Sequence, residues 1–382
     1  MQKLLILLFV LCLAACVTKQ NENISKPTKD DVRYAKGFSL RTQGTYQELI
    51  THQPVDGAPY GKVFWLGKSK HGLTIPDSVT FIEVPIKKII CTSTTHLPHL
   101  VSLQMPETLV GFPTTEYICS EEIRNLVAQG KVAELGSEQN MNLEKILTLQ
   151  PNLVMGYTLT HATGSYKSLK QVGIPILYNA DFLEQHPLGR AEWIRVAGAL
   201  LNKNKQADSI FSAIEKNYTQ LKKLADSVKH KPTVFSGVLY GDGWFMPGGK
   251  NYASVLFRDS GMRYIWEDDS SSGYLQLPAE LVLRKAKSAT FWIGTASFTS
   301  MRALEQADHR YTLFDAFGTS NVFHYNARVS PGGGSFYLEE GYLRPDFILA
   351  DLIKIAHPEL LPNHNFIYYA KLDKNNTSTE RK

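Results

Sequence analysis

Two features are missing from the chain after residue 16: a long apolar run and a concentrated basic stripe. No apolar run there approaches the roughly 20 residues that a membrane-spanning helix needs. The lysines and arginines are scattered, and the formal net charge is only +5 over 382 residues. Binding to nucleic acid needs basic residues gathered on one face, so we expect no nucleic-acid partner. Membrane attachment is expected only at the N-terminus, and the remaining composition is that of an ordinary soluble globule.

Signatures of hydrolases and of nucleotide-binding loops are also missing. The sequence contains neither a Gly-x-Ser-x-Gly nucleophile turn nor a His-Glu-x-x-His zinc motif. Residues 243–251 superficially resemble a phosphate-binding loop but lack its Gly-Lys-Ser/Thr spacing, so we interpret them as a turn that enters a helix. We therefore expect a protein that is not an enzyme, and a surface hydrolase is the alternative from another class.

Clustered metal ligands are scarce. A bare zinc or manganese ion needs three or four converging nitrogen, oxygen or sulfur ligands. His96 and His99 lie on either side of a proline, and neither they nor His161 have an evident acidic partner. We predict no metal-ion site.

Cysteine is rare as well, with four residues in the chain. Cys12 and Cys16 lie in the N-terminal stretch, which leaves Cys91 and Cys119 in the folded part. In an exported protein this pair can form a disulfide. Two buried free thiols are the other reading, and the sequence leaves both open.

The N-terminus carries the most informative motif. An apolar run follows Lys3 and ends in Leu-Ala-Ala-Cys at residues 13–16, which resembles a bacterial lipobox. We predict a signal peptide over residues 1–15 and lipid on Cys16, which becomes the first mature residue. The polar residues 16–31 then form a lipidated tether. The protein is expected in the periplasm, anchored to a membrane through Cys16.

The first folded stretch, residues 32–86, is rich in strand patterns. Alternating and β-branched runs are broken by glycine and proline, which predicts a small antiparallel β-element. The four candidate strands start at Phe38, Tyr46, Lys62 and Val79.

From residue 87 the pattern changes to short apolar runs that alternate with helical segments. This alternation is typical of a parallel sheet covered on both faces. We predict an N-lobe over 87–188, a helical region over 189–229, a C-lobe over 230–372 and a disordered tail over 373–382.

A single long helix is predicted near the middle of the chain. From Lys205 to Val228, apolar residues recur at steps of three and four, which places them on one helix face. At 1.5 Å per residue such a helix is about 36 Å long, enough to cross from one lobe to the other.

The two halves share a pattern on either side of that helix. Glu144 begins a helical motif nine residues before the strand at Leu153, and Glu280 begins a similar motif nine residues before Ala289. Two matches at equal spacing indicate two similar lobes.

These residues resemble a known family, the periplasmic substrate-binding proteins of ABC importers for iron–siderophore complexes, haem and cobalamin. The resemblance covers residues 87–360 and is strongest in NLEKILTLQPNLV at 142–154 and in the long helix. The ending RPDFILADLIKIAHPELLP at 344–362 is similar to the lipoprotein branch of that family. The resemblance implies an α/β fold with two Rossmann-like lobes, parallel sheets and one inter-lobe helix, in addition to the small N-terminal β-element.

The resemblance also implies a mechanism. The ligand lies between lobes that close only slightly, and a glutamate on each lobe meets arginines of the ABC permease dimer. By motif position these are Glu144 and Glu280, although both would also stabilise a helix N-terminus. The protein is expected to act as a monomer.

Ligand-binding residues are expected in loops after the strands, because ligands of open α/β sheets sit beyond the carboxyl ends of the strands. Aromatic rings there can stack on a bulky chelate, and arginine can meet its anionic oxygens. Core packing of any one aromatic, or a structural ion pair for Arg328, is the alternative. The expected ligand-binding residues are Thr94, His96, Tyr157, Tyr240, Trp244, Arg302 and Arg328.

The sequence thus predicts a lipid-anchored, extracytoplasmic binding protein that delivers an iron–siderophore complex to an ABC importer. Cobalamin and haem are the alternative ligands, and the chelate is cargo, so no cofactor is expected. A structural lipoprotein with a vestigial cleft is a further alternative.

Overall fold

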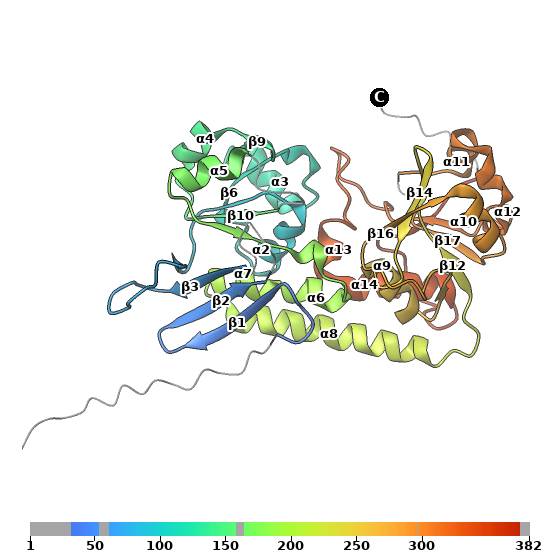
Figure 1. Ribbon diagram of the computed structural model, residues 1–382, viewed down its shortest axis with the longest axis horizontal. Helices are drawn as coiled ribbons and strands as arrows, with labels where there is room; N and C mark the ends of the chain where they lie inside the picture. The colour runs from blue at the N-terminus through green and yellow to red at the C-terminus, as the bar shows by residue number, and fades with distance from the viewer. Residues whose placement is uncertain (1–31, 53–60, 158–163, 296, 375–382) are drawn as a thin grey trace, which may run out of the picture.

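The computed structural model describes residues 32–52, 61–157, 164–295 and 297–374. Two α/β lobes lie side by side along one long helix, with a small β-sheet next to the first lobe (Figure 1). The expected fold class is thereby confirmed. Cys16 and His161 lie outside the described residues.

The N-lobe is built on a five-stranded parallel sheet with the strand order β11-β10-β5-β6-β7. Its central strands are short and fully buried, as expected where both faces of a parallel sheet are covered. The strands are β5 (Ile89–Cys91), β6 (Leu109–Phe112), β7 (Ala133–Glu134), β10 (Leu153–Gly156) and β11 (Ile176–Tyr178). The helices are α2 (Leu97–Ser102), α3 (Glu121–Ala128), α4 (Leu143–Leu149) and α5 (Gly164–Gln171), and a hairpin adds β8 (Gly136–Ser137) and β9 (Asn140–Met141).

The C-lobe repeats this plan with the order β15-β12-β17-β18-β19, in which only β19 runs antiparallel. The strands are β12 (Thr233–Phe235), β15 (Arg263–Tyr264), β17 (Phe291–Ile293), β18 (Val322–His324) and β19 (Ala370–Lys371). The helices are α9 (Tyr252–Asp259), α10 (Ala279–Ala286), α11 (Met301–Ala307), α12 (Asp315–Gly318), α13 (Glu340–Leu343) and α14 (Pro345–Ala356).

The long helix is present as α8 (Asn204–Asp226), close to its predicted bounds. At 1.5 Å per residue it is about 35 Å long. One face carries the buried residues Ala207, Phe211, Ile214 and Tyr218. The helix packs on α7 (Ile194–Leu200) near one end and on α14 of the C-lobe farther along. The helix therefore joins the two lobes. Among the described helices, none has both the length and the apolar character needed to cross a membrane.

The first part of the predicted helical region is not a single helix. It forms two helices, α6 (Pro187–Glu192) and α7 (Ile194–Leu200), with Trp193 between them. The turn there is tighter than an α-helix, because the Val196 N–H donates to the Trp193 carbonyl at 3.0 Å.

A three-stranded antiparallel sheet projects from the C-lobe, formed by β13 (Val238–Tyr240), β14 (Gly243–Pro247) and β16 (Tyr274–Pro278). The chain leaves the parallel sheet for β13 at Gly237, where φ is +86° and a Cβ would stand 1.8 Å from the Phe245 carbonyl oxygen. Only glycine fits there. The turn predicted over residues 243–251 is therefore wrong in its first half, which is strand β14.

The N-terminal β-element contains the four expected strands, β1 (Phe38–Gln43), β2 (Tyr46–Thr51), β3 (Lys62–Gly67) and β4 (Val79–Glu83). It is not wholly antiparallel, because β4 pairs with β3 in parallel. Residues 68–78 return the chain to the start of the sheet, which makes a parallel pairing possible.

Two buried carboxylates fix the start of this element to the helical region. Glu192 accepts hydrogen bonds from the backbone N–H groups of Arg33, Tyr34 and Ala35 at 2.8–3.0 Å. Glu184, which lies just after the 3-10 helix Asp181–Leu183 and before α6, accepts those of residues 36 and 37 at 2.8–2.9 Å. Five consecutive backbone N–H groups thus donate to the carboxylates of Glu192, at the end of α6, and Glu184, just before that helix.

Candidate functional site

A cavity of about 240 Å³ lies at the carboxyl ends of β12 and β17, on the C-lobe side of the lobe junction. Ligand sites of open α/β sheets lie at this edge. Its wall includes Arg190 of α6 and the turn residues Gly237 and Gly294 that follow the two strands. Six tyrosines complete it: Tyr252, Tyr274, Tyr325, Tyr337, Tyr342 and Tyr369.

Arg190 is the positive charge of this cavity. Its guanidinium carbon lies 3.6 Å from the ring centre of Tyr252 and 4.4 Å from that of Tyr342, which is a cation–π sandwich. Its N–H groups donate to the backbone carbonyls of Glu184 and Phe182 at 3.3 and 3.2 Å. Within the described part of the chain, no carboxylate forms an ion pair with Arg190, so its charge is available to an anionic ligand.

The phenols around Arg190 are neutral at physiological pH. Burial raises the pKa of Tyr252 and that of Tyr337 above the ordinary value of tyrosine. Neutral phenols offer ring faces and hydroxyl donors, and no base or nucleophile. The arrangement suits binding rather than catalysis.

The outer face of the antiparallel sheet extends the cavity with aromatic surface. Side chains alternate along β14, so Trp244 and Met246 point into the core and Phe245 points outward. Tyr240 and Tyr274 are 78% and 74% exposed, and Tyr240 meets Phe245 edge to face at 5.8 Å. These three rings form what we call the aromatic platform.

The N-lobe contributes Tyr157, directly after β10. Its ring meets Phe182 edge to face at 4.6 Å, and its N–H donates to the Thr92 hydroxyl at 2.8 Å. Burial is the main cause that raises the pKa of Tyr157 to about 12, and the nearby Tyr342 of the C-lobe adds to this increase. Tyr157 is thus the predicted residue that the fold brings toward the tyrosines of the other lobe.

Behind Tyr157 lies a polar network. The Tyr166 hydroxyl donates to Glu138 at 2.7 Å and lies 2.8 Å from the Thr92 hydroxyl. Burial raises the pKa of Glu138 above its ordinary value. This network orients Thr92 and, through it, the backbone at Tyr157.

Two of the predicted ligand residues belong to the protein core instead. Trp244 is 1% exposed, and its indole N–H donates to the Ser236 carbonyl at 3.0 Å. His96 is also 1% exposed, and burial lowers its pKa to about 3. Neither side chain presents a surface to a ligand, and alternation along β14 explains the error at Trp244.

The two predicted arginines lie apart from Arg190. Arg302 of α11 lines a separate surface depression with Glu305 and Phe317. Arg328 lies over the Phe336 ring at 4.0 Å and pairs with Glu340 at 3.1 Å, so the structural ion pair considered for it is present. Thr94 is half-buried in the short 3-10 helix after β5.

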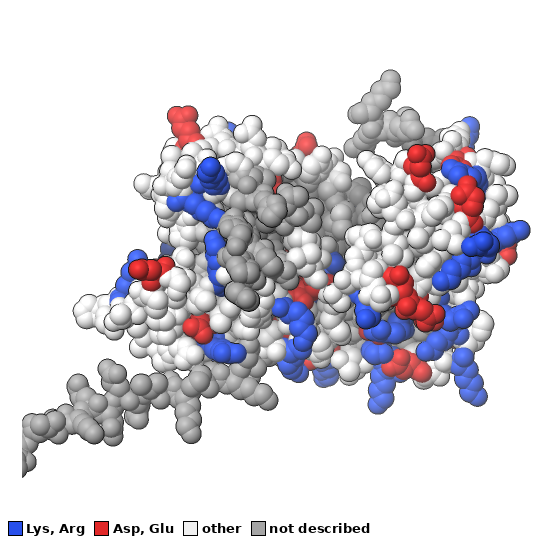
Figure 2. All heavy atoms as spheres, in the orientation of Figure 1, with Lys and Arg blue, Asp and Glu red and all other residues white. Residues whose placement is uncertain are grey.

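The two predicted docking glutamates are exposed, each in the first turn of its helix. Glu144 lies on α4 of the N-lobe and Glu280 on α10 of the C-lobe, where Arg310 approaches it to 3.7 Å. Figure 2 shows acidic and basic side chains on both lobes, with many lysines and arginines on the lower part of the C-lobe.

The described residues contain no group of three or more His, Cys, Asp or Glu side chains that could hold a metal ion. Cys91 and Cys119 are both buried free thiols, so the disulfide left open by the sequence does not form.

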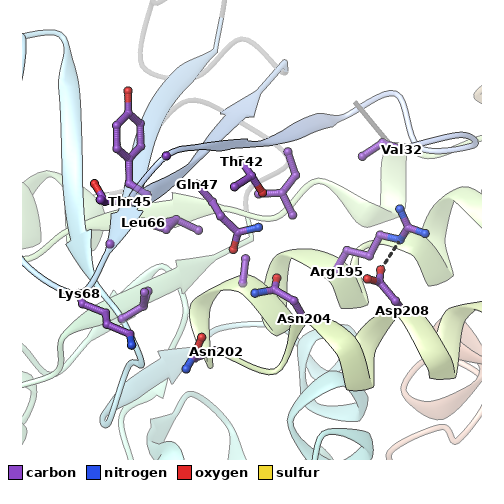
Figure 3. Close-up of a pocket in the computed structure, with 16 residues that line it drawn as sticks. Val32, Thr42, Thr45, Gln47, Leu66, Lys68, Arg195, Asn202, Asn204 and Asp208 are labelled. Carbon is purple, nitrogen blue, oxygen red and sulfur yellow. Dashed lines mark ion pairs between the residues drawn. The ribbon is translucent and has the colours of Figure 1, made fainter. Parts of the chain in front are cut away.

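A second cavity, of about 410 Å³, lies between the β-element and the turn from α7 to α8 (Figure 3). The amides of Gln47, Asn202 and Asn204 face one another across it, and Arg195 pairs with Asp208 at 3.3 Å on one side. No predicted site residue lies there. This cavity lies between the β-element and the helical region and shares no lining residue with the tyrosine-lined cavity.

Sequence reasoning missed Arg190 and the tyrosines around it. A lone arginine inside the apolar helix that starts at Pro187 was a usable signal, because a buried cation needs a specific partner. Tyr252 and Tyr342 carry no such signal, since they come from distant helices that only the fold brings together.

Comparison with known proteins agrees with this architecture. A family profile described as "Periplasmic binding protein" matches residues 89–329. Two uncharacterized lipoproteins of Methanocaldococcus jannaschii are each 25% identical to this chain. The two matches cover 94% and 89% of this chain and 84% and 86% of the relatives.

Solved structures share the fold at low identity. A periplasmic haem-binding protein of Pseudomonas aeruginosa has a TM-score of 0.55 at 16% identity, over 72% of this chain and 94% of that one. A possible iron-binding protein of Staphylococcus epidermidis has a TM-score of 0.54 at 17% identity, and the match covers 71% of this chain and 98% of that one. The vitamin B12-binding protein of Vibrio cholerae has a TM-score of 0.51 at 17% identity, and the match covers 71% of this chain and 96% of that one. Because the profile spans more than half of its residues, this chain belongs to the periplasmic binding protein family, whose members bind solutes and are not enzymes.

Proposed function

We propose that the protein is a lipid-anchored receptor that captures a metal chelate between its lobes and delivers it to an ABC importer. The observation that carries this proposal is Arg190, a cation without a carboxylate partner among the described residues, set between tyrosine rings at the lobe junction. Such a site suits a ligand with flat apolar surface and anionic oxygens.

The size of the ligand follows from the same geometry. The tyrosine-lined cavity of about 240 Å³ is small, but the exposed rings of Tyr240, Phe245 and Tyr274 continue it outward. A ligand larger than the cavity can therefore rest on the aromatic platform while its charged end meets Arg190. Ferric siderophore is our first ligand class, with cobalamin and haem as alternatives. The iron-, haem- and B12-binding proteins named above support this range.

The proposed ligand contacts combine sequence and structure. The set leaves out Trp244 and His96, because both are buried in the core, and Arg302, because it lines a separate depression. The proposed set is Thr94, Tyr157, Tyr240 and Arg328 from the sequence, and Arg190, Tyr252 and Tyr274 from the structure.

The remaining parts of the proposal concern delivery. Glu144 and Glu280 are proposed to meet the permease dimer, because two exposed carboxylates on separate lobes set orientation and register. Lipid on Cys16 is proposed to hold the receptor at the membrane in the periplasm. The lipoprotein relatives support this location.

Fluorescence quenching with ferric siderophores, cobalamin and haem tests the proposal. We expect one chelate to bind wild type saturably, and Arg190→Met to weaken that binding by about tenfold or more, roughly 1.4 kcal/mol. Arg284→Met, on the exposed side of α10, is the matched control and should bind as wild type. Failure of every chelate to bind contradicts the function. Equal affinity in Arg190→Met removes Arg190 from the site.

A further inference from the structure

A segment of the C-lobe crosses to the N-lobe on the side away from α8. We call residues 326–339, between β18 and α13, the strap. In Figure 1 this orange segment rises in the space between the two lobes, whereas α8 runs below them. The strap ends at α13, which packs on α2 of the N-lobe.

The first contact of the strap is a carboxylate that accepts two hydrogen bonds from the other lobe. Glu339 Oε2 accepts from the Cys119 N–H and Oε1 from the Ser120 N–H, both at 2.8 Å. Glu339 is 3% exposed. Ser120 is the N-cap residue of α3, so the carboxylate lies at the positive end of that helix.

The second contact is backbone against backbone. A Cβ on Gly332 would stand 2.0 Å from the Glu116 carbonyl oxygen, and one on Gly334 would stand 1.9 Å from that of Tyr117. No side chain fits at such distances, so the strap needs glycine at both positions. Ser330 holds the loop in shape, because its hydroxyl accepts from the Gly334 N–H at 2.9 Å.

We infer that the strap is a second, releasable connection between the lobes, fastened by Glu339, and that it sets the width of the cleft on the side opposite α8. The two connections differ in kind. The long helix α8 is continuous and resists hinging, whereas the strap is held to the N-lobe by non-covalent contacts. When the strap is fastened, ligand passes only through the other openings of the cleft; this last consequence rests on the proposed function.

The strength of the fastening is limited by the burial of Glu339. Burial raises the pKa of this carboxyl to about 7, whereas the N–H groups of Cys119 and Ser120 act in the opposite direction. The cost of removing a charge from water therefore offsets much of what the hydrogen bonds contribute. Because the desolvation cost and the hydrogen bonds nearly cancel, the contact of Glu339 with the N-lobe can break without unfolding either lobe.

The next residue provides a matched control. Glu340 lies beside Glu339, but its carboxylate pairs with Arg328 of the same lobe. Removing Glu340 changes charge at nearly the same place and leaves the inter-lobe contact intact. Gly318 is the corresponding control for the glycines, because a Cβ there meets nothing within 4 Å.

Interspin distances in ligand-free protein test the inference, with one label in each lobe on Gln129→Cys and Ser288→Cys, both exposed. We expect Glu339→Ala to give a longer and broader distance distribution than wild type, and Glu340→Ala to match wild type. Hydrogen exchange should show loss of protection at residues 119–120 in the same variant only. Unchanged distances and protection in folded Glu339→Ala overturn the inference.

If Glu339→Ala does not fold, Gly334→Ala gives the answer. Its new methyl must push the strap off Tyr117, so the distance distribution should lengthen relative to Gly318→Ala. Identical distributions in these two variants overturn the inference. Since no ligand is present in these measurements, their outcome is independent of whether the protein binds a chelate.

Discussion

The two lobes share a scaffold and differ in what is added to it. Each has a five-stranded sheet and a glutamate-bearing helix that leads into a central strand. The C-lobe adds an antiparallel sheet and the strap at the carboxyl ends of its strands. The N-lobe adds Tyr157 and the hydrogen-bond network around Glu138 there. The C-lobe thus supplies most of the ring surface, and the N-lobe supplies the Tyr157 ring with a buried polar network behind it.

This difference indicates a division of labour. The shared parts place Glu144 and Glu280 at equivalent positions on both lobes, as symmetric docking to a dimer would require. The unshared parts differ: most of the rings near the proposed ligand site belong to the C-lobe, whereas the N-lobe places Tyr157 there. The predictions below test this division, and the largest expected effect comes first.

Removing both docking glutamates tests what the lobes share. We expect Glu144→Ala with Glu280→Ala to reduce uptake of the chelate to background while its affinity for the purified protein is unchanged. The reason is that both carboxylates are exposed and neither lines the tyrosine-lined cavity. Transport assays with Glu83→Ala plus Glu267→Ala as the control measure this. Normal uptake in the docking variant would refute the assignment.

Adjacent residues of β14 separate the core of the C-lobe from its aromatic platform. Trp244 packs on Phe235, Trp292 and Phe314, so Trp244→Ala should lower the free energy of unfolding by about 3–5 kcal/mol. Phe245→Ala, one residue along and facing outward, should cost about 1 kcal/mol or less. Urea unfolding compares them, and equal losses would contradict the placement of the two rings.

A buried carboxyl gives the N-lobe a pH dependence. Asp181 is 1% exposed, and burial raises its pKa to about 7. Because the pKa is higher in the folded than in the unfolded chain, the folded state binds the proton more tightly. The stability that this proton contributes is complete below about pH 4 and is lost as pH rises through 7.

Asp181→Asn should therefore be as stable as wild type near pH 4 and more stable at pH 8, by about 4 kcal/mol for a shift of about three pKa units. The asparagine oxygen can still accept from Thr95, as Asp181 does at 3.3 Å. Urea unfolding at a series of pH values measures the difference, with exposed Asp315→Asn as the control. A difference that stays constant with pH would show that Asp181 does not titrate in this way.

The smallest effect is expected on the aromatic platform. Tyr240→Ala should weaken chelate binding by about 0.5–1.5 kcal/mol and leave the melting temperature unchanged, because the ring is exposed in the free protein. Phe366→Ala removes another exposed ring outside the tyrosine-lined cavity and serves as the control. A platform variant that binds as tightly as this control would exclude Tyr240 from the ligand site.

The general fold could be predicted from the sequence because its signals are local. The three- and four-residue steps along α8 and the apolar strand runs each lie within one segment, and strand ends indicated where the cleft lies. Residue-level prediction failed where two segments must meet. The residue Trp244 was placed on the wrong face because β14 was read as a turn, and a shift of one residue in a strand reverses its faces.

The contact between Glu339 and α3 shows the same limit. These groups are separated by about 220 residues in the sequence. The local pattern of neither segment indicates that the two are in contact. Arg190 was missed for a similar reason, since its partners Tyr252 and Tyr342 lie on different helices of the other lobe.

The attachment of residues 33–37 to Glu184 and Glu192 has a mechanical consequence for a receptor held by its N-terminal end. A pull on the chain from that end is shared among five hydrogen bonds before it reaches β1. The load passes into α6 through Glu192 and into the segment just before it through Glu184, so the strands of the β-element are not separated one hydrogen bond at a time. Under the proposed anchoring at the N-terminal end, a pull would therefore move the folded part of the molecule as one body.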